Sequence, residues 1–247
     1  MALVKVVSYN LRKHRAVNEL AALDERYTPD VLCLQEADTT DLPKHLHQLE
    51  LATSTTGNRL GLAVYYRADR FSFESVRAFA LKKSMHDHIL RPAHERLVGV
   101  RLLDHEAQRE LMVASFHAAP LTALNSLRRH QIKSALGELQ IMGPGLPTLM
   151  VGDYNYPLFK GSLAAKVRDY GYDLTLSDSR TYTRYKFFRG HFDLATSVGF
   201  DIEKVETLPR GSSDHLPILV DARYADTVPA GEVIEPIDPD EGPDISM

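Results

Sequence analysis

Four apolar segments of this chain each run directly into a side chain that can bind a metal ion or move a proton. The segments are "VVSYN", "VLCLQE", "MVASFH" and "LMVGD", and they end at Asn10, Glu36, His117 and Asp153. Short apolar runs predict buried strands, whereas Asp and Asn are depleted within strands and favoured in turns. One such ending has an ordinary explanation, a strand followed by a polar turn. Four of them in one chain predict a sheet that delivers polar side chains to a shared site beyond its strand ends.

The rest of the chain alternates strand-like runs with segments of helical spacing. Residues 16–27, 122–141 and 162–170 place apolar side chains about every three or four positions, which predicts amphipathic helices. No low-complexity linker or fixed-period repeat interrupts residues 1–224. This pattern predicts one α/β domain of packed layers over that range. The apolar runs that predict strands are 3–9, 31–35, 61–66, 71–81, 96–103, 111–117, 148–152, 192–198 and 216–222.

Residues 225–247 have a different composition from the rest of the chain. They hold seven acidic residues and four prolines but no Lys or Arg. Without them, 26 of the 33 acidic residues remain against 29 Lys and Arg, so residues 1–224 carry a formal charge of +3. The composition predicts a disordered, acidic, proline-rich tail, and an alternative is a nucleic-acid mimic that competes for a basic cleft. The weakly basic remainder is compatible with a phosphate-bearing substrate.

Composition also bounds where the protein acts. The single cysteine, Cys33, lies in the apolar run "VLCLQ", which excludes an internal disulfide and predicts a buried thiol. No apolar run approaches the roughly 20 residues of a membrane span. The first ten residues, "MALVKVVSYN", read as a strand and lack the pattern of a signal peptide. We therefore expect a cytoplasmic protein without a membrane anchor, and we favour a monomer.

The order of these motifs resembles the endonuclease/exonuclease/phosphatase superfamily, which includes deoxyribonuclease I, exonuclease III-type enzymes, inositol polyphosphate phosphatases and neutral sphingomyelinases. Each motif is weak alone, but the ordered set spans residues 3–221. The resemblance implies a four-layer α/β sandwich, in which two mixed β-sheets are flanked by helices and the site lies at one edge. The matching stretches are "SYNLR", "LCLQEAD", "GLAVYYR", "ASFHAAP", "VGDYNYP", "HFDLATS" and "SSDHLPILV".

Carried over through these motifs, the resemblance implies a divalent metal ion. Glu36 is then the principal ligand, and Asn10 and Asp214 complete or support the metal shell. Mg²⁺ is the expected ion, with Mn²⁺ as an alternative, because hard cations prefer oxygen ligands. Asp153 is expected to orient or deprotonate the attacking water, and Asn155 to hydrogen-bond a phosphate oxygen or to position that water.

The resemblance also implies roles for two histidines. His215 is expected to contact the scissile phosphate, and Asp193 to orient that histidine and raise its pKa. Protonated His215 would stabilise the charge that develops in the transition state. An ordinary turn aspartate is the alternative for Asp193. The stretch "SFHAAP" resembles that of deoxyribonuclease I-like enzymes, which implies that His117 is a general acid on the leaving oxygen. Abasic-site endonucleases usually carry a different stretch, so that activity is disfavoured.

These observations favour a metal-dependent phosphodiester hydrolase, and within that class a nuclease acting on DNA or RNA. Residues 180–191, "RTYTRYKFFRGH", interleave basic and aromatic side chains that could track a nucleic-acid backbone, although a solvated hairpin is an equal alternative. A second hypothesis is a phosphatase or phosphodiesterase of smaller esters, such as phosphoinositides or sphingomyelin-like lipids. The third is a non-catalytic binding module, which would be expected to have lost some of its costly carboxylates.

Truncation after Tyr224 tests the prediction of a disordered tail. The removed residues have few large apolar side chains to bury, and their four prolines would interrupt any helix. The truncated protein should therefore melt within a degree or two of the full chain in a thermal unfolding experiment, a shift of well under about 1 kcal/mol. A large drop in melting temperature would instead show that the tail docks on the domain.

Overall fold

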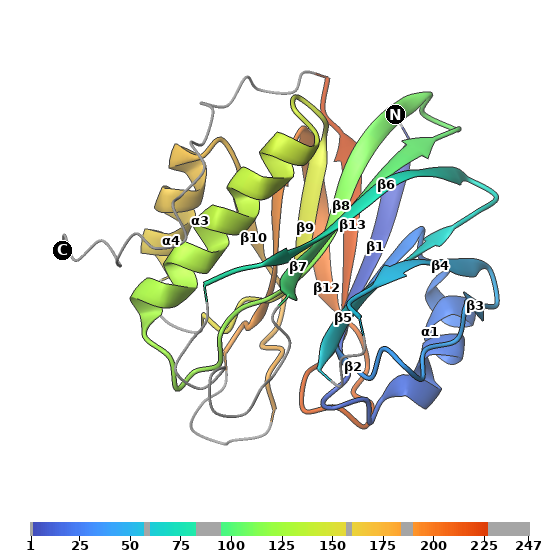
Figure 1. Cartoon of the computed structure of the whole chain (residues 1–247), viewed down its shortest axis with the longest axis horizontal. Helices are drawn as coiled ribbons and strands as arrows, with labels where there is room; N and C mark the ends of the chain where they lie inside the picture. Colours follow the sequence, from blue (N-terminus) through green and yellow to red (C-terminus); the bar gives the residue numbers. More distant parts are fainter. Residues whose placement is uncertain (1, 57–59, 83–94, 157–159, 184–189, 227–247) are drawn as a thin grey trace.

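Two β-sheets pack face to face, and helices cover their outer faces (Figure 1). The computed structural model describes residues 2–56, 60–82, 95–156, 160–183 and 190–226. Within these residues, one sheet has the strand order β12 (Phe200–Thr207), β13 (Ile218–Tyr224), β1 (Leu3–Asn10), β2 (Val31–Ala37), β5 (Gly61–Arg67), β4 (Leu49–Ser54) and β3 (His45–Leu46). The other has the order β10 (Asp173–Leu176), β11 (Asp193–Val198), β9 (Thr148–Asp153), β8 (Arg109–His117), β7 (Glu95–Asp104) and β6 (Phe71–Ala80).

Each sheet contains a parallel pair of strands near its centre. β1 is parallel to β2, and β8 is parallel to β9, whereas the other described neighbours are antiparallel. Parallel strands need a crossover connection. The 3₁₀-helix η1 (Val17–Glu19) and the helix α1 (Leu20–Tyr27) supply the first, and α3 (Asn125–Met142) supplies the second. As a result, the two strands of each parallel pair have their carboxyl ends at the same edge of their sheet.

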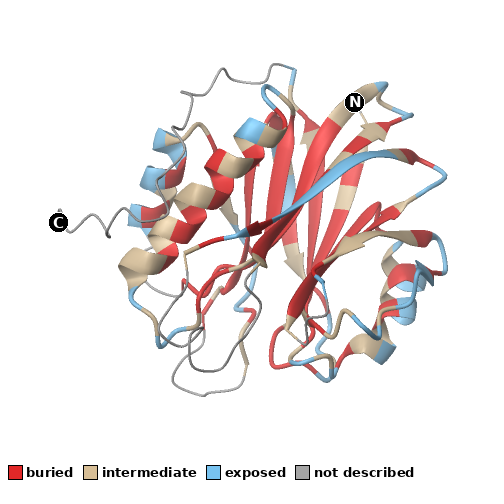
Figure 2. Ribbon diagram, in the orientation of Figure 1, coloured by how far each residue is buried: buried red, intermediate tan, exposed pale blue. Residues whose placement is uncertain are grey.

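The central strands are buried on both faces, which explains why their sequences are unbroken apolar runs. Val6 of β1 packs between the sheets, whereas its neighbour Val7 packs outward in the cluster that contains Leu20. In the same way Val113 of β8 faces inward and Met112 faces outward. Figure 2 shows this buried interior in red. Cys33 belongs to the cluster between the sheets, as predicted, and none of the described helices is long and apolar enough to cross a membrane.

Helices α3 and α4 (Lys160–Asp169) cover the outer face of the second sheet (Figure 1). The buried face of α3 repeats at helical spacing, with Ile132, Leu136 and Leu139 packed against strand residues of that sheet. From α4, Leu163 and Val167 join the same cluster. With α1 on the other sheet, these helices complete the four layers that the resemblance implied, so the predicted fold is confirmed.

The sequence did not predict the strands β3, β4, β10 and β12. β12 lies at the edge of its sheet, and its exposed side chains include Asp201, Glu203 and Lys204. A register shift between Ile202 and Lys204 also breaks the alternation by which a half-buried strand is identified. β4 carries a similar shift between Leu51 and Thr53. In β12 and β4 these shifts interrupt the apolar period that revealed the central strands.

Helix α3 begins at Asn125, whereas the sequence predicted a helix that begins at residue 122. Leu124 has extended backbone angles, with φ −69° and ψ 147°, so the helix cannot include it. The guanidinium of Arg128 donates hydrogen bonds to the carbonyl oxygens of Pro120 and Ala123, at 2.7 and 2.9 Å. These bonds hold the preceding residues in a loop instead of a further helical turn.

A buried ionic network joins the two sheets at the end where β1 begins. Arg70 donates to Asp30 at 2.9 Å, to Asp104 at 2.7 Å and to the carbonyl oxygen of Leu3 at 2.8 Å. The hydroxyl of Tyr224 donates to Asp104 at 2.9 Å. Asp30 precedes β2 and Asp104 ends β7, so one guanidinium neutralises a carboxylate from each sheet. Such a network is stable only while every member is present, because an unpaired buried charge is costly.

Replacing Arg70 with alanine should strongly destabilise the fold. The substitution leaves Asp30 and Asp104 without their buried partner, and losses of this kind cost about 3–5 kcal/mol, or roughly 6–20 °C in melting temperature for a domain of this size. The matched control is Arg223→Ala, which removes an arginine from an exposed ion pair with Glu203 and should melt close to the wild type. Equal melting temperatures for both variants would contradict a stabilising role for the network.

Candidate active site

The predicted site residues gather at one edge of the sandwich because of the directions of their strands. Asn10, His117 and Asp153 are the last residues of β1, β8 and β9, and Glu36 lies near the end of β2. His117 and Asp153 are register partners in the parallel pair. Asp193 begins β11, which runs antiparallel to β9 and pairs with Asp153. The start of one strand thus lies beside the ends of the others.

The remaining predicted residues reach the same edge from connecting segments. Asp214 and His215 lie just before β13, which runs antiparallel to β1, and Asn155 lies just after β9. The hydroxyl of Ser213 donates to the carbonyl oxygen of Asn10 at 2.6 Å, which ties this segment to the end of β1. All the residues that the sequence singled out are therefore delivered to one region of the fold.

Two polar contacts fix the distance between the sheets at this edge. The side-chain amide of Asn10 donates to Asp153 Oδ2 across the interface at 3.1 Å. One layer deeper, Gln35 Nε2 donates to Ser115 Oγ at 2.9 Å, and that hydroxyl donates to the carbonyl oxygen of Leu34 at 2.9 Å. All of these groups except the carbonyl belong to fully buried side chains. Buried polar groups that satisfy one another across an interface fix its register more sharply than apolar contacts do.

Glu36 has an unusual backbone conformation. Its φ is +51°, in the left-handed region, and the pairing of β2 with β5 shifts register between Leu34 and Ala37. Such strain costs on the order of 1–3 kcal/mol and collects at functional sites. The backbone N–H of Lys13 donates to Glu36 Oε2 at 2.9 Å, and that of His14 donates to its carbonyl oxygen at 2.8 Å. The bulge and these bonds aim the carboxylate, which is 24% exposed, out of the sheet.

The turn that holds Glu36 is itself left-handed. Arg12, Lys13 and His14 have φ values of 48°, 55° and 66°. His14 accepts the backbone N–H of Asp38 at its Nδ1 atom, at 2.9 Å. It therefore braces the segment that follows Glu36. Three consecutive non-glycine residues in this conformation persist only because the surrounding hydrogen bonds stabilise it.

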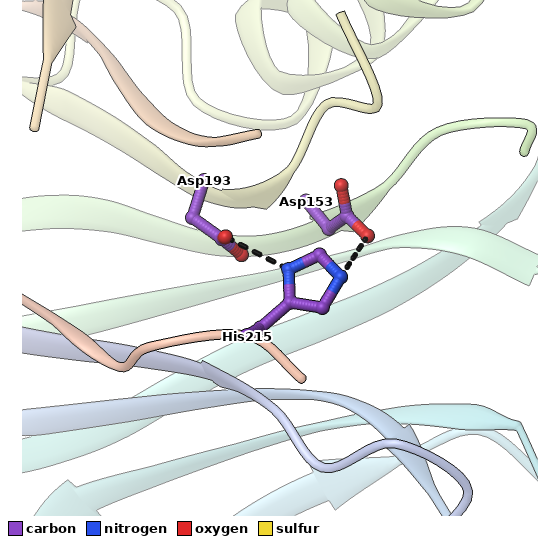
Figure 3. Close-up of side chains that lie close together, drawn as sticks. All are labelled: Asp153, Asp193 and His215. Atoms are coloured by element: carbon purple, nitrogen blue, oxygen red, sulfur yellow. Dashed lines mark hydrogen bonds and ion pairs between the residues drawn. The ribbon is translucent and has the colours of Figure 1, made fainter. Parts of the chain in front are cut away.

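Asp153, Asp193 and His215 form a close group (Figure 3). The Nδ1 atom of His215 hydrogen-bonds Asp193 Oδ2 at 2.9 Å, and its Nε2 atom lies 3.7 Å from Asp153 Oδ2. Within the described residues, these are three side chains whose ligand atoms all lie within 4.8 Å of one another. Because the imidazole already bonds Asp193, the group is better described as a hydrogen-bonded pair facing a second carboxylate than as a metal shell.

Opposite charges set the protonation of this group. Burial alone would lower the pKa of His215, but the carboxylates of Asp193 and Asp153 outweigh it and raise the pKa to about 10. Burial raises the pKa of Asp153 to about 7, an effect that His215 opposes and Asp193 strengthens. At neutral pH, His215 is thus a buried cation beside a carboxyl group that can exchange a proton.

His117 has the opposite character. Burial lowers its pKa to about 3, and the positive charges of Arg96 and His215 act in the same direction. Its Nε2 atom lies 3.7 Å from Asp153 Oδ2 and 4.0 Å from Glu36 Oε1. Without substrate, His117 is therefore a neutral imidazole at pH 7, although the resemblance implied a proton donor.

The other two predicted residues are also oriented by hydrogen bonds. Asn155 has φ +48°, donates its backbone N–H to Asp153 Oδ1 at 2.9 Å, and donates its side-chain amide to the carbonyl oxygen of Ala118 at 3.3 Å. Asp214 Oδ2 lies 3.4 Å from Arg12 Nε. Arg12 thus engages the carboxylate of Asp214, whose charge also helps to raise the pKa of the neighbouring His215.

Several supporting residues had no sequence signal. Arg96, on β7, donates to the carbonyl oxygens of His117 and Ala118, at 3.1 Å each. Glu19 accepts hydrogen bonds from the hydroxyl of Tyr9 and from the backbone and side chain of Ser212, which opens the stretch "SSDHLPILV". These contacts join segments up to 193 positions apart in the chain. No local motif could reveal them.

The chemistry of these donors fits a hard divalent cation. Glu36, Asp153 and Asp214 supply carboxylate oxygens, and Asn10 supplies an amide oxygen at the same edge. A nearby cation would also favour the ionised form of Asp153, whose burial otherwise raises its pKa. Oxygen-rich sets of this kind suit Mg²⁺, which binds through one or two carboxylates and retains waters.

Three comparisons relate this geometry to known proteins. A sequence profile described as "Endonuclease/Exonuclease/phosphatase family" matches residues 7–215. "Protein angel" of Drosophila melanogaster is 28% identical over 160 residues, which are 60% of this chain and 44% of that protein. The chain therefore spans less than half the length of this relative.

Among solved structures, the fold is similar to that of Bacteroides thetaiotaomicron mannosyl-6-phosphatase Bt3783, with a TM-score of 0.72 and 17% identity over 90% of this chain and 100% of that one. It is equally similar to D. rerio TDP2 complexed with a single-strand DNA product, with a TM-score of 0.72 and 14% identity over 91% of this chain and 100% of that one. At these identities the likeness concerns the fold alone.

The Asp193→Asn variant should lower the pKa of His215. The carboxylate of Asp193 is the strongest of the groups that raise this pKa to about 10, and the amide keeps the shape but not the charge. An NMR titration of the His215 ring should therefore show a midpoint well below that of the wild type. The control Asp201→Asn changes an exposed carboxylate on β12 and should leave the midpoint in place.

The same linkage predicts how stability depends on pH. Because the folded pKa of His215 is raised above its ordinary value of 6.5, its protonation stabilises the native state fully below about pH 6.5, and this stabilisation is lost as the pH rises through about 10. The loss between these values should be smaller for Asp193→Asn. An unchanged NMR midpoint in that variant would contradict the assignment.

Proposed function

We propose that this chain, which belongs to the endonuclease/exonuclease/phosphatase family, hydrolyses phosphate esters and is a Mg²⁺-dependent phosphodiesterase that cleaves nucleic acid. The observation that carries the proposal is the pairing of protonated His215 with Asp153, at 3.7 Å, beside oriented Asn155. A cation that can bind phosphate thus lies next to a carboxyl group with a pKa of about 7. The fold shared with TDP2, which was solved with a single-strand DNA product, supports nucleic acid as the substrate.

The metal would be held at the edge where Glu36 and Asn10 lie, with Asp214 in support. When bound, such an ion supplies positive charge to a phosphoryl oxygen. The backbone N–H of Lys13 donates to the carboxylate of Glu36, and that of His14 donates to its carbonyl oxygen. These two bonds keep the side chain of Glu36 directed outward without the ion. A ligand that is already oriented loses little conformational freedom when it binds.

Asp153 would take the proton of the attacking water. A base works best when its pKa lies near the operating pH, and burial brings that of Asp153 to about 7. Its Oδ2 atom accepts a hydrogen bond from Asn10, and its Oδ1 atom accepts one from the backbone of Asn155. These two bonds fix the direction in which the carboxylate meets the water, while the side chain of Asn155 positions the water or a phosphate oxygen.

The two histidines would serve the phosphate and the leaving group. His215 keeps its Nδ1 atom on Asp193 and its Nε2–H on the side of Asp153, 3.7 Å away, where it could meet a phosphoryl oxygen at which charge develops. The bound phosphate would bring negative charge to His117 and raise the low pKa that burial gives it. His117 could then donate its proton to the departing oxygen as the P–O bond breaks.

A phosphatase of smaller esters is the second candidate, and one observation favours it. The mannosyl-6-phosphatase shares the fold over its full length, with the same TM-score as TDP2. Under either function we propose that residues 1–224 form the working domain, that the protein acts in the cytoplasm, and that it is a monomer. Plasmid DNA, RNA, phosphoinositides and sphingomyelin, each tested with Mg²⁺ and with a chelator, separate the candidates: turnover of DNA or RNA that stops with the chelator supports the proposal.

Glu36→Gln should sharply lower both Mg²⁺ affinity and turnover while leaving the fold intact. The amide keeps the shape of the side chain but lacks the charge that a hard cation needs, so activity at limiting Mg²⁺ should fall by roughly 10–100-fold or more. The control Glu25→Gln changes an exposed carboxylate on α1 and should behave as the wild type. Wild-type turnover of Glu36→Gln at limiting Mg²⁺ would show that the ligand assignment is wrong.

His117→Ala and Asp153→Asn should differ in their dependence on the leaving group. General acid catalysis contributes typically 10²–10⁴-fold, and most of that factor should be lost for a DNA substrate, whose leaving oxygen is a strongly basic alkoxide. A p-nitrophenyl diester has a leaving oxygen that is already stable as an anion, so His117→Ala should slow it little. Asp153→Asn should slow both esters heavily, because each needs an activated water.

Turnover of both variants on both esters at saturating Mg²⁺ makes this measurement. If His117→Ala slows the activated and unactivated esters equally, the histidine is not the leaving-group acid. Its low pKa would then indicate a neutral phosphate-binding imidazole.

A further inference from the structure

A cavity of about 550 Å³ opens beside the candidate active site, on the segment that carries the basic and aromatic stretch noted in the sequence. Its volume is within the range of pockets that bind small ligands. It lies among the residues that follow β10, His191 in the segment before β11, and Arg210 in the connection between β12 and β13. The lining residues are Asp178, Ser179, Arg180, Tyr182, Thr183, His191 and Arg210.

The cavity carries more positive than negative charge. Arg180 and Arg210 are exposed, and within the described part of the chain their side chains make no hydrogen bond or ion pair. Asp178 is the one acidic lining residue, and its Oδ1 atom accepts both the backbone N–H and the hydroxyl of Thr207, at 2.8 and 2.9 Å. One carboxylate, already engaged elsewhere, thus faces two guanidinium groups that have no described partner.

The wall of the cavity is attached to the catalytic residues. The ring of Tyr182 packs edge-on against the ring of His215, with 5.0 Å between centroids, and the two residues form a backbone bridge. Thr183 donates both its N–H and its hydroxyl to the carbonyl oxygen of Asp214, at 2.9 and 3.0 Å. The cavity therefore begins one side chain away from His215, and both are held by the same short segment.

We propose that this cavity is a second phosphate-binding subsite, which holds a phosphate group of the substrate adjacent to the one that is cleaved. The inference rests on the proposed function, because nucleic acid presents such a neighbouring phosphate. Guanidinium groups bind phosphate through paired N–H donors, and Arg180 and Arg210 offer two of them. Tyr182 adds an aromatic surface of the kind on which a base or sugar packs in single-strand binding sites. The subsite gives Arg180, Tyr182 and Thr183 of the stretch 180–191 a role in selecting substrates with two phosphates, and residues 184–189 of that stretch lie outside the described residues.

Equilibrium binding tests the subsite without relying on turnover. The full chain is titrated in a calorimeter with thymidine 3′,5′-bisphosphate and with each thymidine monophosphate, in the presence of a chelator so that no ester is hydrolysed. The wild type should bind the bisphosphate on the order of tenfold more tightly than the better monophosphate, as expected for added charge-assisted hydrogen bonds. In the double variant Arg180→Gln/Arg210→Gln, this preference should disappear.

A matched control removes the same charge elsewhere. Arg26→Gln/Arg168→Gln neutralises two exposed arginines on α1 and α4, outside the cavity lining, and should keep the preference. Equal affinity of the wild type for bisphosphate and monophosphate would overturn the proposal. So would a preference that survives in Arg180→Gln/Arg210→Gln, or one that the control loses to the same extent.

The two proposals fail in different ways. If the chain cleaves neither DNA nor RNA but still prefers the bisphosphate through Arg180 and Arg210, the nuclease assignment is wrong and the subsite stands. If the chain cleaves nucleic acid and shows no such preference, the subsite is wrong and the nuclease assignment stands.

Discussion

The hydrogen bond from Asn10 to Asp153, at 3.1 Å, joins the ends of the two sheets, and the geometry of the site depends on it. Asn10 comes from one parallel pair and Asp153 from the other, so the bond is possible only if both sheets end in register. Gln35 and Ser115 repeat the constraint one layer deeper, where both side chains are fully buried. A shift of one residue in either sheet would turn these side chains to the opposite face and leave buried polar groups unpaired.

This register places His117 and His215 at the same edge, in environments that shift their pKa values in opposite directions. Two imidazoles share the edge, yet the pKa of His117 falls to about 3 and that of His215 rises to about 10. Burial lowers both, but the carboxylates of Asp193 and Asp153 raise the pKa of His215, whereas the positive charges of Arg96 and His215 lower that of His117 further. Titratable groups whose environments separate their pKa values indicate distinct acid and base functions. The separated pKa values of His117 and His215 therefore favour an enzyme over a binding module.

Much of this could be predicted from the sequence, because the central strands are buried on both faces and their polar ends stand out. Asn10, Glu36, His117 and Asp153 were identified in this way. The left-handed backbone of Glu36 could not be, since Glu is not a residue that signals positive φ. Nor could the contact between Glu19 and Ser212, which joins positions 193 apart. The edge strand β12 was not predicted, because its register shift and its exposed charges interrupt the apolar period.

The two ends of the sandwich use their polar groups differently. At one end Arg70 donates to Asp30, Asp104 and a carbonyl oxygen, so the opposite charges of the network are paired. At the other end the buried Oδ1 atom of Asp193 has no hydrogen-bond partner in the described part of the chain, and Glu36 and Asn155 hold left-handed conformations. Strain and unmet hydrogen-bonding capacity are tolerated only where the rest of the fold compensates for them. The strained, charged edge at which the candidate site lies therefore depends on the packing and the paired charges of the rest of the fold.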